Sequence, residues 1–112
     1  MKGSEVYRSQ MKEGNLHRLI QIEVSKHGHR LFRNNVGKLQ DANGEWIAFG
    51  VGGVGGSDLI GWTRHGVFAA IEVKTPTGRV RPEQVAFVNA VNRAGGKAGI
   101  ARSVEDALAI LG

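Results

Sequence analysis

Apolar residues recur at helical spacing near the start of the chain, over residues 12–27. Four of them occupy one helix face at the spacing i, i+3, i+4, i+8: Leu16, Leu19, Ile20 and Val24. This pattern predicts an amphipathic helix, which Gly28 would end as a C-cap. Residues 1–10 are expected to be an extension with little structure of their own, and residues 30–33 to be a short strand.

A hairpin is predicted after this strand. Asn43-Gly44 is a dipeptide typical of tight hairpin turns, and the stretches on either side, residues 36–40 and 45–49, would pair as its strands. Phe49 is expected in the core, whereas Trp46 is left open between the core and a position that faces a substrate.

The second half of the chain alternates strands and helices. Residues 67–74 have the composition of a buried strand, Pro82 suits the first position of a helix, and residues 97–102 form a second strand pattern. Ser103 would cap a terminal helix. Apolar residues are expected to face inward on both helices: Val85, Phe87, Val88 and Val91 on the first, and Val104, Leu108 and Leu111 on the second. This order predicts one α/β domain over residues 11–112, with a mixed central β-sheet flanked by α-helices.

The predicted strand 67–74 carries a carboxylate and an ammonium two residues apart, Glu72 and Lys74. Side chains at i and i+2 of a strand point to the same face, so these two residues are expected to be neighbours. Asp58 ends the glycine-rich stretch before this strand and could join them. Two carboxylates and a lysine on one face of a sheet are typical of a nuclease metal site.

These residue types suit the cleavage of a phosphodiester. The reaction needs a water in line with the leaving oxygen and positive charge at the phosphate, and Mg²⁺ or Mn²⁺ held by a few carboxylate oxygens supplies both. Asp58 and Glu72 would provide those oxygens, and the backbone carbonyl of Val73 could add a ligand. Lys74 would orient or deprotonate the water.

The overall charge agrees with a polyanionic substrate. The 112 residues include 15 Lys and Arg against 10 Asp and Glu, which gives a formal net charge of +5. The sequence contains no cysteine, which excludes disulfides and thiolate zinc sites. It has neither an apolar segment of membrane-spanning length nor a signal-peptide core at its start, so a cytosolic protein is expected.

The central residues also admit other interpretations. Residues 50–55 match the dinucleotide fingerprint G-x-G-x-x-G, but no helix of useful length fits after the motif, and Asp58 would repel a phosphate. The glycines would instead let the backbone approach nucleic acid, bend to aim Asp58 at Glu72, or form a flexible hairpin end. Glu72 and Lys74 could be an exposed charge pattern on an edge strand.

The remaining ionisable residues indicate no further site by themselves. Glu13 lies in the first turn of the predicted helix, where the helix dipole favours a carboxylate. The four histidines show no metal-ligand spacing and are expected at the surface: His17, His27, His29 and His65.

Six short motifs in order resemble the virus-type replication-repair nuclease (VRR-NUC) branch of the PD-(D/E)XK nuclease superfamily. They are Glu13-x-x-Leu16, Arg33-Asn34-Asn35-x-Gly37, Gly56-Ser57-Asp58, Ile71-Glu72-Val73-Lys74, Pro82-Glu83-Gln84 and Ala101-Arg102-Ser103. The resemblance covers nearly the whole chain from Met11 onward. The sequence departs from the family at His17, where Gln is common, and at Arg81, where a Thr or Ser helix cap is usual.

The resemblance implies a restriction-endonuclease-like fold and a nuclease that depends on Mg²⁺ or Mn²⁺. The catalytic residues that it implies are Glu13, Asp58, Glu72, Lys74 and Gln84. Asp58 and Glu72 would be the main metal ligands and Lys74 the catalytic lysine. The resemblance assigns Glu13 the role of an active-site acid and a further metal ligand, in place of a charge at the helix end. Glu23 is the alternative to Glu13 in this role.

The resemblance also implies that DNA is the substrate. Candidate nucleic-acid contacts are five cations and two polar residues: Arg33, Lys38, Arg79, Arg81 and Lys97, with Asn35 and Ser57. Stand-alone members of the family are phage or bacterial enzymes that form homodimers and cut branched DNA such as Holliday junctions or flaps, and a two-fold junction suits a two-fold enzyme. The alternative is a catalytically silent nucleic-acid-binding domain of the same fold.

Overall fold

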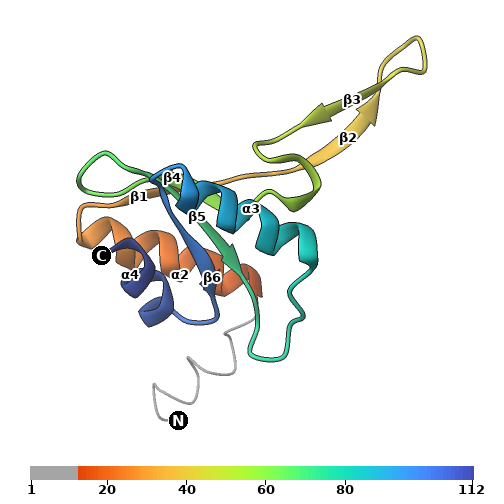
Figure 1. Cartoon of the computed structure of the whole chain (residues 1–112). Helices are drawn as coiled ribbons and strands as arrows, with labels where there is room; N and C mark the ends of the chain where they lie inside the picture. The colour runs from red at the N-terminus through yellow and green to blue at the C-terminus, as the bar shows by residue number, and fades with distance from the viewer. Residues whose placement is uncertain (1–12) are drawn as a thin grey trace.

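The computed structural model describes residues 13–112, and the predicted N-terminal extension, residues 1–10, lies outside this range. The elements follow in the order α2 (Glu13–Lys26), β1 (Arg30–Arg33), β2 (Gly37–Gln40), β3 (Trp46–Phe49), the 3-10 turn η1 (Gly53–Gly55), β4 (Leu59–Trp62), β5 (Phe68–Val73), α3 (Pro82–Arg93), β6 (Lys97–Ala101) and α4 (Val104–Leu111) (Figure 1). None of the helices in this part of the chain is long and apolar enough to cross a membrane.

The centre of the fold is a four-stranded sheet in the order β1-β4-β5-β6. β1 pairs antiparallel with β4, and β4 with β5, whereas β5 and β6 run parallel. Parallel neighbours need a crossover connection, which α3 provides between β5 and β6. The predicted mixed sheet flanked by helices is confirmed, and β5, which carries Glu72, is an interior strand.

Helices cover both faces of this sheet (Figure 1). On one face, α2 and α4 pack around the larger core, whose buried side chains include Leu16, Ile20, Val24, Leu31, Leu59, Ile71, Val73 and Leu111. On the other face, Val88 of α3 packs against Ala70 and Ala98. The prediction that Val85 faces inward is wrong, since its side chain is 43% exposed. Gln84 is buried instead, because its side chain is hydrogen-bonded beneath the helix.

β2 and β3 form a separate two-stranded hairpin that projects from the body of the molecule (Figure 1). Asp41 Oδ1 accepts hydrogen bonds from the N–H groups of Asn43 (2.8 Å) and Glu45 (2.9 Å). Gly44 adopts a φ of 81°, a conformation that glycine allows at little cost. The hairpin predicted around Asn43-Gly44 is therefore confirmed.

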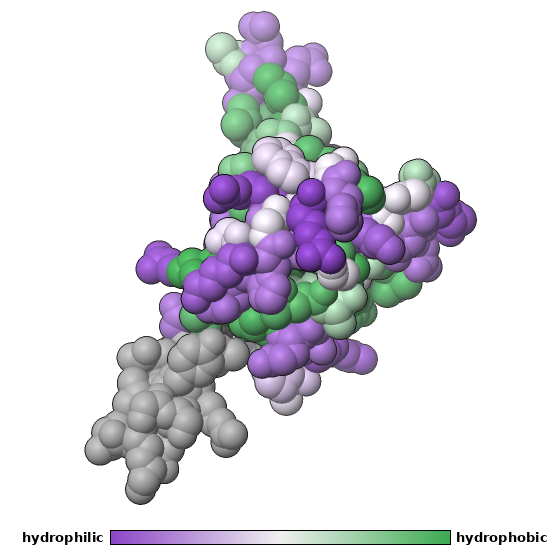
Figure 2. Space-filling view, turned by 90° about the vertical axis from the view of Figure 1, so that its left-hand side faces the viewer, coloured by the Kyte–Doolittle hydropathy of each residue, from purple (hydrophilic) through white to green (hydrophobic). Residues whose placement is uncertain are grey.

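One face of the hairpin is apolar, and nothing in the described chain covers it. The strand register pairs Leu39 with Ile47 and Gly37 with Phe49, so the three apolar side chains point to the same side. They are 52%, 47% and 41% exposed in the order Leu39, Ile47, Phe49, and Figure 2 shows hydrophobic residues along the projecting hairpin. The expectation of a core Phe49 is wrong, because the hairpin leaves the body of the molecule and the ring, which lies over Gly37, is 41% exposed. Trp46 lies on the opposite hairpin face and is also exposed.

Candidate active site

The start of β4 and the end of β5 bring Asp58 and Glu72 together. The register pairs Leu59 with Ile71, which places the two acids beside each other at the next position. The N–H of Asp58 donates to Glu72 Oε1 (3.1 Å), and the N–H of Val73 donates to Asp58 Oδ2 (3.0 Å). Each carboxyl group is thus held by the backbone of the other strand, and Glu72 is only 2% exposed.

Lys74 lies beside the carboxyl group of Glu72, on the face of β5 that the spacing of the two residues predicts. Its Nζ is 3.4 Å from Glu72 Oε2, and its side chain is 15% exposed. The interpretation of Glu72 and Lys74 as an exposed pattern on an edge strand is wrong, because β5 has a neighbour on each side and Glu72 is buried.

Gln84 connects these residues to the start of α3. Its amide donates from Nε2 to Glu72 Oε2 and accepts at Oε1 from the N–H of Arg81 (2.9 Å). Gln84 thus makes the N3 half of a capping box, with Arg81 at the N-cap position where Ser or Thr is usual. The amide fixes one oxygen of Glu72 relative to the helix.

A histidine that was expected at the surface completes the cluster. His17 on α2 is 4% exposed, and its Nε2 lies 3.2 Å from Asp58 Oδ2. The surface expectation is also wrong for His29, which is 3% exposed and accepts a hydrogen bond at Nδ1 from the N–H of Arg64 (3.0 Å). Helix periodicity contained a signal for His17, since it lies three residues before the buried Ile20.

The environment shifts the pKa values of Asp58 and Glu72 in opposite directions. Burial, followed by the charge of Asp58, raises the pKa of Glu72 above its ordinary value, although Lys74 opposes this change. Burial also raises the pKa of Asp58, but hydrogen bonds from His17 and from the N–H of Val73 outweigh it, so the pKa of Asp58 is lowered overall. A bound cation would relieve the repulsion between the two carboxylates.

The carboxyl oxygens of Asp58 and Glu72 fit a hard divalent cation such as Mg²⁺ or Mn²⁺ in their chemistry. Among the described residues, no three His, Cys, Asp or Glu side chains gather closely enough to hold a metal without other ligands. Further ligands would come from backbone oxygens, water or a substrate phosphate, which Mg²⁺ commonly uses.

The other predicted metal ligands are Glu13, its alternative Glu23, and the backbone carbonyl of Val73. The side chain of Glu13 lies outside the described part of the chain, although its backbone begins α2, the helix that carries His17. Glu23 forms an ion pair with Lys26 (2.9 Å) on the same helix. Val73 follows Glu72 at the end of β5 and is fully buried.

The glycine-rich stretch folds as a compact loop that leads to Asp58. Residues 53–55 form a single 3-10 turn in place of a helix, so the dinucleotide-binding interpretation is wrong. A Cβ at Gly55 would lie 2.2 Å from a backbone oxygen in the first turn of α3, and one at Gly56 would lie 2.1 Å from Val51 O. Glycine is needed at both positions because backbone packs directly against backbone.

Asn34, which is predicted only as part of the motif Arg33-Asn34-Asn35-x-Gly37, holds this loop from the end of β1. Its Nδ2 donates to Val51 O (2.8 Å) and to Ser57 O (2.9 Å), and its Oδ1 accepts from the N–H of Val51 (2.9 Å). The N–H of Asn34 also donates to Asp58 O (2.8 Å). One residue therefore fixes both ends of the loop.

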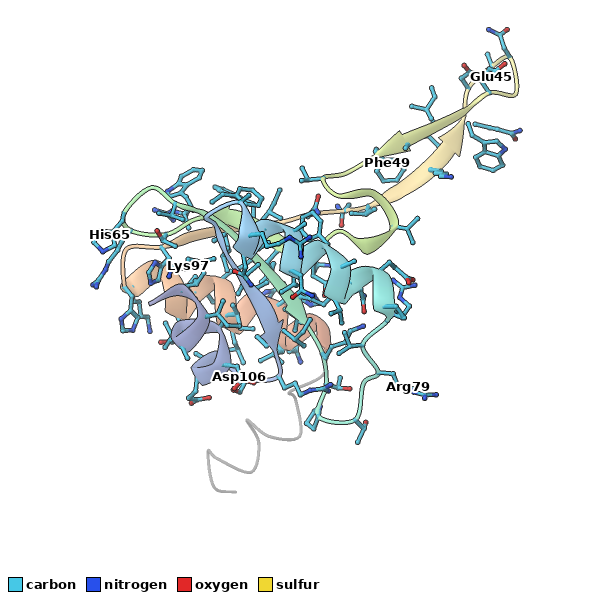
Figure 3. The ribbon with its side chains drawn as sticks, viewed as in Figure 1. Glu45, Phe49, His65, Arg79, Lys97 and Asp106 are labelled. Carbon is cyan, nitrogen blue, oxygen red and sulfur yellow. The ribbon has the colours of Figure 1, made fainter. Side chains whose placement is uncertain are left out.

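A cleft of about 710 Å³ lies between the base of the hairpin and the acidic cluster. Asp58 and Gln84 line it, together with four of the candidate nucleic-acid contacts: Arg33, Asn35, Lys38 and Arg81. The other three candidates lie elsewhere. Arg79 is on the loop after β5, and Lys97 begins β6 at the far end of the sheet (Figure 3). Ser57 is 1% exposed and does not face the cleft.

Comparison with known proteins agrees with this geometry. The family model of the VRR-NUC domain matches residues 11–105, a segment that contains the whole cluster from His17 to Gln84. Searches of curated proteins and of solved structures return no match. Because the family model covers most of the chain, we conclude that the chain belongs to the VRR-NUC family and has a nuclease domain of the PD-(D/E)XK type.

Proposed function

We propose that this nuclease is a Mg²⁺- or Mn²⁺-dependent DNA endonuclease that hydrolyses phosphodiester bonds in branched DNA, such as Holliday junctions or flaps. The observation that carries the proposal is the contact of Asp58, Glu72 and Lys74 beside a cleft with a cationic lining. A phosphodiester offers the negative charge that such a cleft attracts and the bond that such a cluster can hydrolyse.

Each residue of the cluster has a separate task in the proposed reaction. A divalent cation held by Asp58 and Glu72 would supply charge compensation at the phosphate and a more acidic water. Lys74, with its Nζ 3.4 Å from Glu72, would orient the attacking water and neutralise charge as the phosphorus–oxygen bond breaks. Gln84 and His17 keep the two carboxyl groups in position through their contacts with Glu72 and Asp58. Glu13 would add a ligand from the start of α2.

The cleft would bind the DNA backbone mainly through charge. Arg33, Lys38 and Arg81 line it, and each phosphate contact should steepen the salt dependence of binding by about 0.9 in the logarithmic slope. Arg79 and Lys97 lie outside the cleft and would contact only a longer substrate.

The hairpin supports the proposal of a homodimer. A two-stranded hairpin is marginally stable alone, and an exposed apolar face such as that of Leu39, Ile47 and Phe49 is typical of an interaction surface. The hairpin also borders the cleft, so pairing through it would relate two clefts by a two-fold axis. Ile47→Asp should therefore give a monomer in sedimentation velocity. Gln40→Asp, on the opposite hairpin face, should leave the dimer unchanged.

Cleavage of labelled four-way-junction, flap and linear duplex DNA tests the enzymatic proposal. The wild type should cut branched DNA fastest with Mg²⁺ or Mn²⁺, and Lys74→Ala should abolish cutting. Lys26→Ala is the matched control, because Lys26 pairs with Glu23 on the exposed side of α2. Salt-sensitive binding without cleavage by any of the proteins would instead identify a catalytically silent DNA-binding domain.

A further inference from the structure

Part of the sheet face that α3 covers remains open and carries aromatic side chains. α3 packs over β5 and β6, whereas Phe32 on β1, Trp62 on β4 and Phe68 at the start of β5 are 49%, 49% and 42% exposed. The rings of Phe32 and Trp62 have centroids 5.5 Å apart. Trp62 is also paired directly with Phe68 across the strands, so the three aromatic residues are neighbours on one face of the sheet. This surface, defined by Phe32, Trp62 and Phe68, is called the aromatic face below.

A cation borders the aromatic face, and the strands that form this face carry no carboxylate. Arg30 is paired with Trp62 across β1 and β4, and it is exposed. The sequence has no Asp or Glu in residues 27–40 or 59–71, the segments that supply these strands and the turn that joins β4 to β5. The other exposed tryptophan, Trp46, differs in this respect because Asp41 and Glu45 adjoin it in the hairpin. Figure 3 places the turn, marked by His65, and the tip of the hairpin, marked by Glu45, at opposite ends of the molecule.

Aromatic rings together with cations bind unpaired nucleotides, because bases stack on the rings while phosphates contact the cations. The aromatic face is therefore better suited to single-stranded nucleic acid than to a second copy of this basic chain.

The aromatic face lies on the same side of the sheet as the candidate active site. Asp58 immediately precedes β4, and Trp62 ends that strand four residues later, which corresponds to about 13 Å. Phe68 and Glu72 share one face of β5, as residues at even spacing do. A strand that leaves the cleft along β4 would reach the rings within about four stacked nucleotides at about 3.4 Å each.

We propose that Phe32, Trp62 and Phe68 form a stacking platform for the unpaired nucleotides of a DNA substrate, with Arg30 contacting its phosphates. This inference extends the proposed function. It rests on that function in one respect, which is that the strand bound to the platform is the substrate of the nuclease. Binding to the platform requires no cleavage and no divalent metal.

The two tryptophans of the chain allow a direct test by fluorescence. Trp46→Phe leaves Trp62 as the reporter on the platform, and Trp62→Phe leaves Trp46 as the matched reporter on the hairpin. Both proteins are titrated in EDTA with an oligothymidylate of about 12 nucleotides. This length is about three times the span of about four nucleotides between the cleft and the rings. The emission of Trp62 should be quenched on binding, and that of Trp46 should not change.

Affinity measured by anisotropy with a labelled oligothymidylate gives the second readout. Trp62→Ala should weaken binding about tenfold or more, as expected for the loss of one stacking ring. Trp46→Ala should stay within about twofold of the wild type. Circular dichroism checks that the variants are folded, and the more conservative Trp62→Phe should retain most of the affinity.

Two outcomes would overturn the platform. In the first, the emission of Trp62 does not change at saturating oligonucleotide, and Trp62→Ala binds the oligonucleotide with the affinity of the wild type. The second is a Trp62→Ala protein that binds normally but changes from dimer to monomer in sedimentation, which would make the aromatic face a protein interface. Failure of the proposed nuclease activity is separate, because it would show as absent cleavage with the fluorescence response intact.

Discussion

Replacing Gln84 with leucine removes the amide that links α3 to the carboxyl group of Glu72. Leucine has a similar volume, so the change tests the hydrogen bonds more than the packing. The amide contacts Glu72 Oε2 on one side and the N–H of Arg81 on the other, at 2.9 Å. Gln84 is 4% exposed and Glu72 is 2% exposed, so water cannot easily replace the lost partner.

The expected loss of unfolding free energy follows from these two bonds. A hydrogen bond to a charged group contributes about 1.5–3 kcal/mol and a neutral one about 0.5–1.5 kcal/mol, which together give about 2–4.5 kcal/mol. At about 4 °C per kcal/mol for a domain of this size, the melting temperature should fall by about 8–18 °C. Cleavage should fall as well, because Glu72 Oε2 would lose the hydrogen bond that holds it toward α3, and only the contacts with Asp58 and Lys74 would remain.

Urea unfolding in EDTA measures the free energy, and cleavage of junction DNA with Mn²⁺ measures the activity. Asn89→Leu is the control, since it replaces an exposed amide on the same helix and should change stability by less than about 0.5 kcal/mol. A Gln84→Leu protein as stable as this control would refute the structural role of the amide. Lower stability with normal cleavage would show that Gln84 supports only the fold.

The remaining predictions concern a strand glycine and the buried histidine. Gly61→Ala would place a Cβ 1.9 Å from Arg30 O, so β1 and β4 must separate and stability should fall by about 1–3 kcal/mol in urea unfolding. Gly14→Ala, in open space on α2, should gain about 0.5–1 kcal/mol in the same measurement, and equal stability of the two variants would contradict the close β1–β4 contact. His17→Ala removes the strongest hydrogen bond that lowers the pKa of Asp58, so that pKa should rise. A lowered carboxyl pKa stabilises the fold above the unfolded-state pKa, and this stability is lost as the pH falls through the folded-state pKa. His17→Ala should therefore unfold at a higher pH than the wild type in an acid titration followed by circular dichroism. His17→Gln, which keeps an N–H donor, should restore much of the difference, and identical midpoints for wild type and His17→Ala would count against the contact.

Local patterns sufficed for the features that depend on local chemistry. The period of α2, the turn at Asn43-Gly44 and the shared face of Glu72 and Lys74 all follow from backbone geometry, and the structure has each of them. Gln84 is predicted as a site residue only by the motif Pro82-Glu83-Gln84. Nothing in the periodicity of α3 distinguishes a buried amide from an exposed one.

The errors arise where burial depends on distant parts of the chain. Phe49 is apolar, but the hairpin that carries it extends past the sheet, so hydrophobicity alone could not place it in the core. Val85 has a suitable helical position, yet the contact between Gln84 and Glu72 sets the rotation of α3. The period of α2 indicates that His17 can face inward, but its contact with Asp58 depends on how α2 lies against the strand end, which no local pattern contains.

The hydrogen bonds of Asn34 make the geometry of the candidate active site sensitive to mechanical displacement of the hairpin. Asn34 stands between β1 and β2, and it binds Val51 just after β3 and Ser57 just before Asp58. A force that tilts the hairpin, whether from a protein partner or from DNA entering the cleft, acts on Val51 and Asn34 together. Because the same side chain holds Ser57, this displacement is transmitted to Asp58 over a few covalent bonds. The orientation of the hairpin and the readiness of the carboxyl pair are therefore coupled through a single amide.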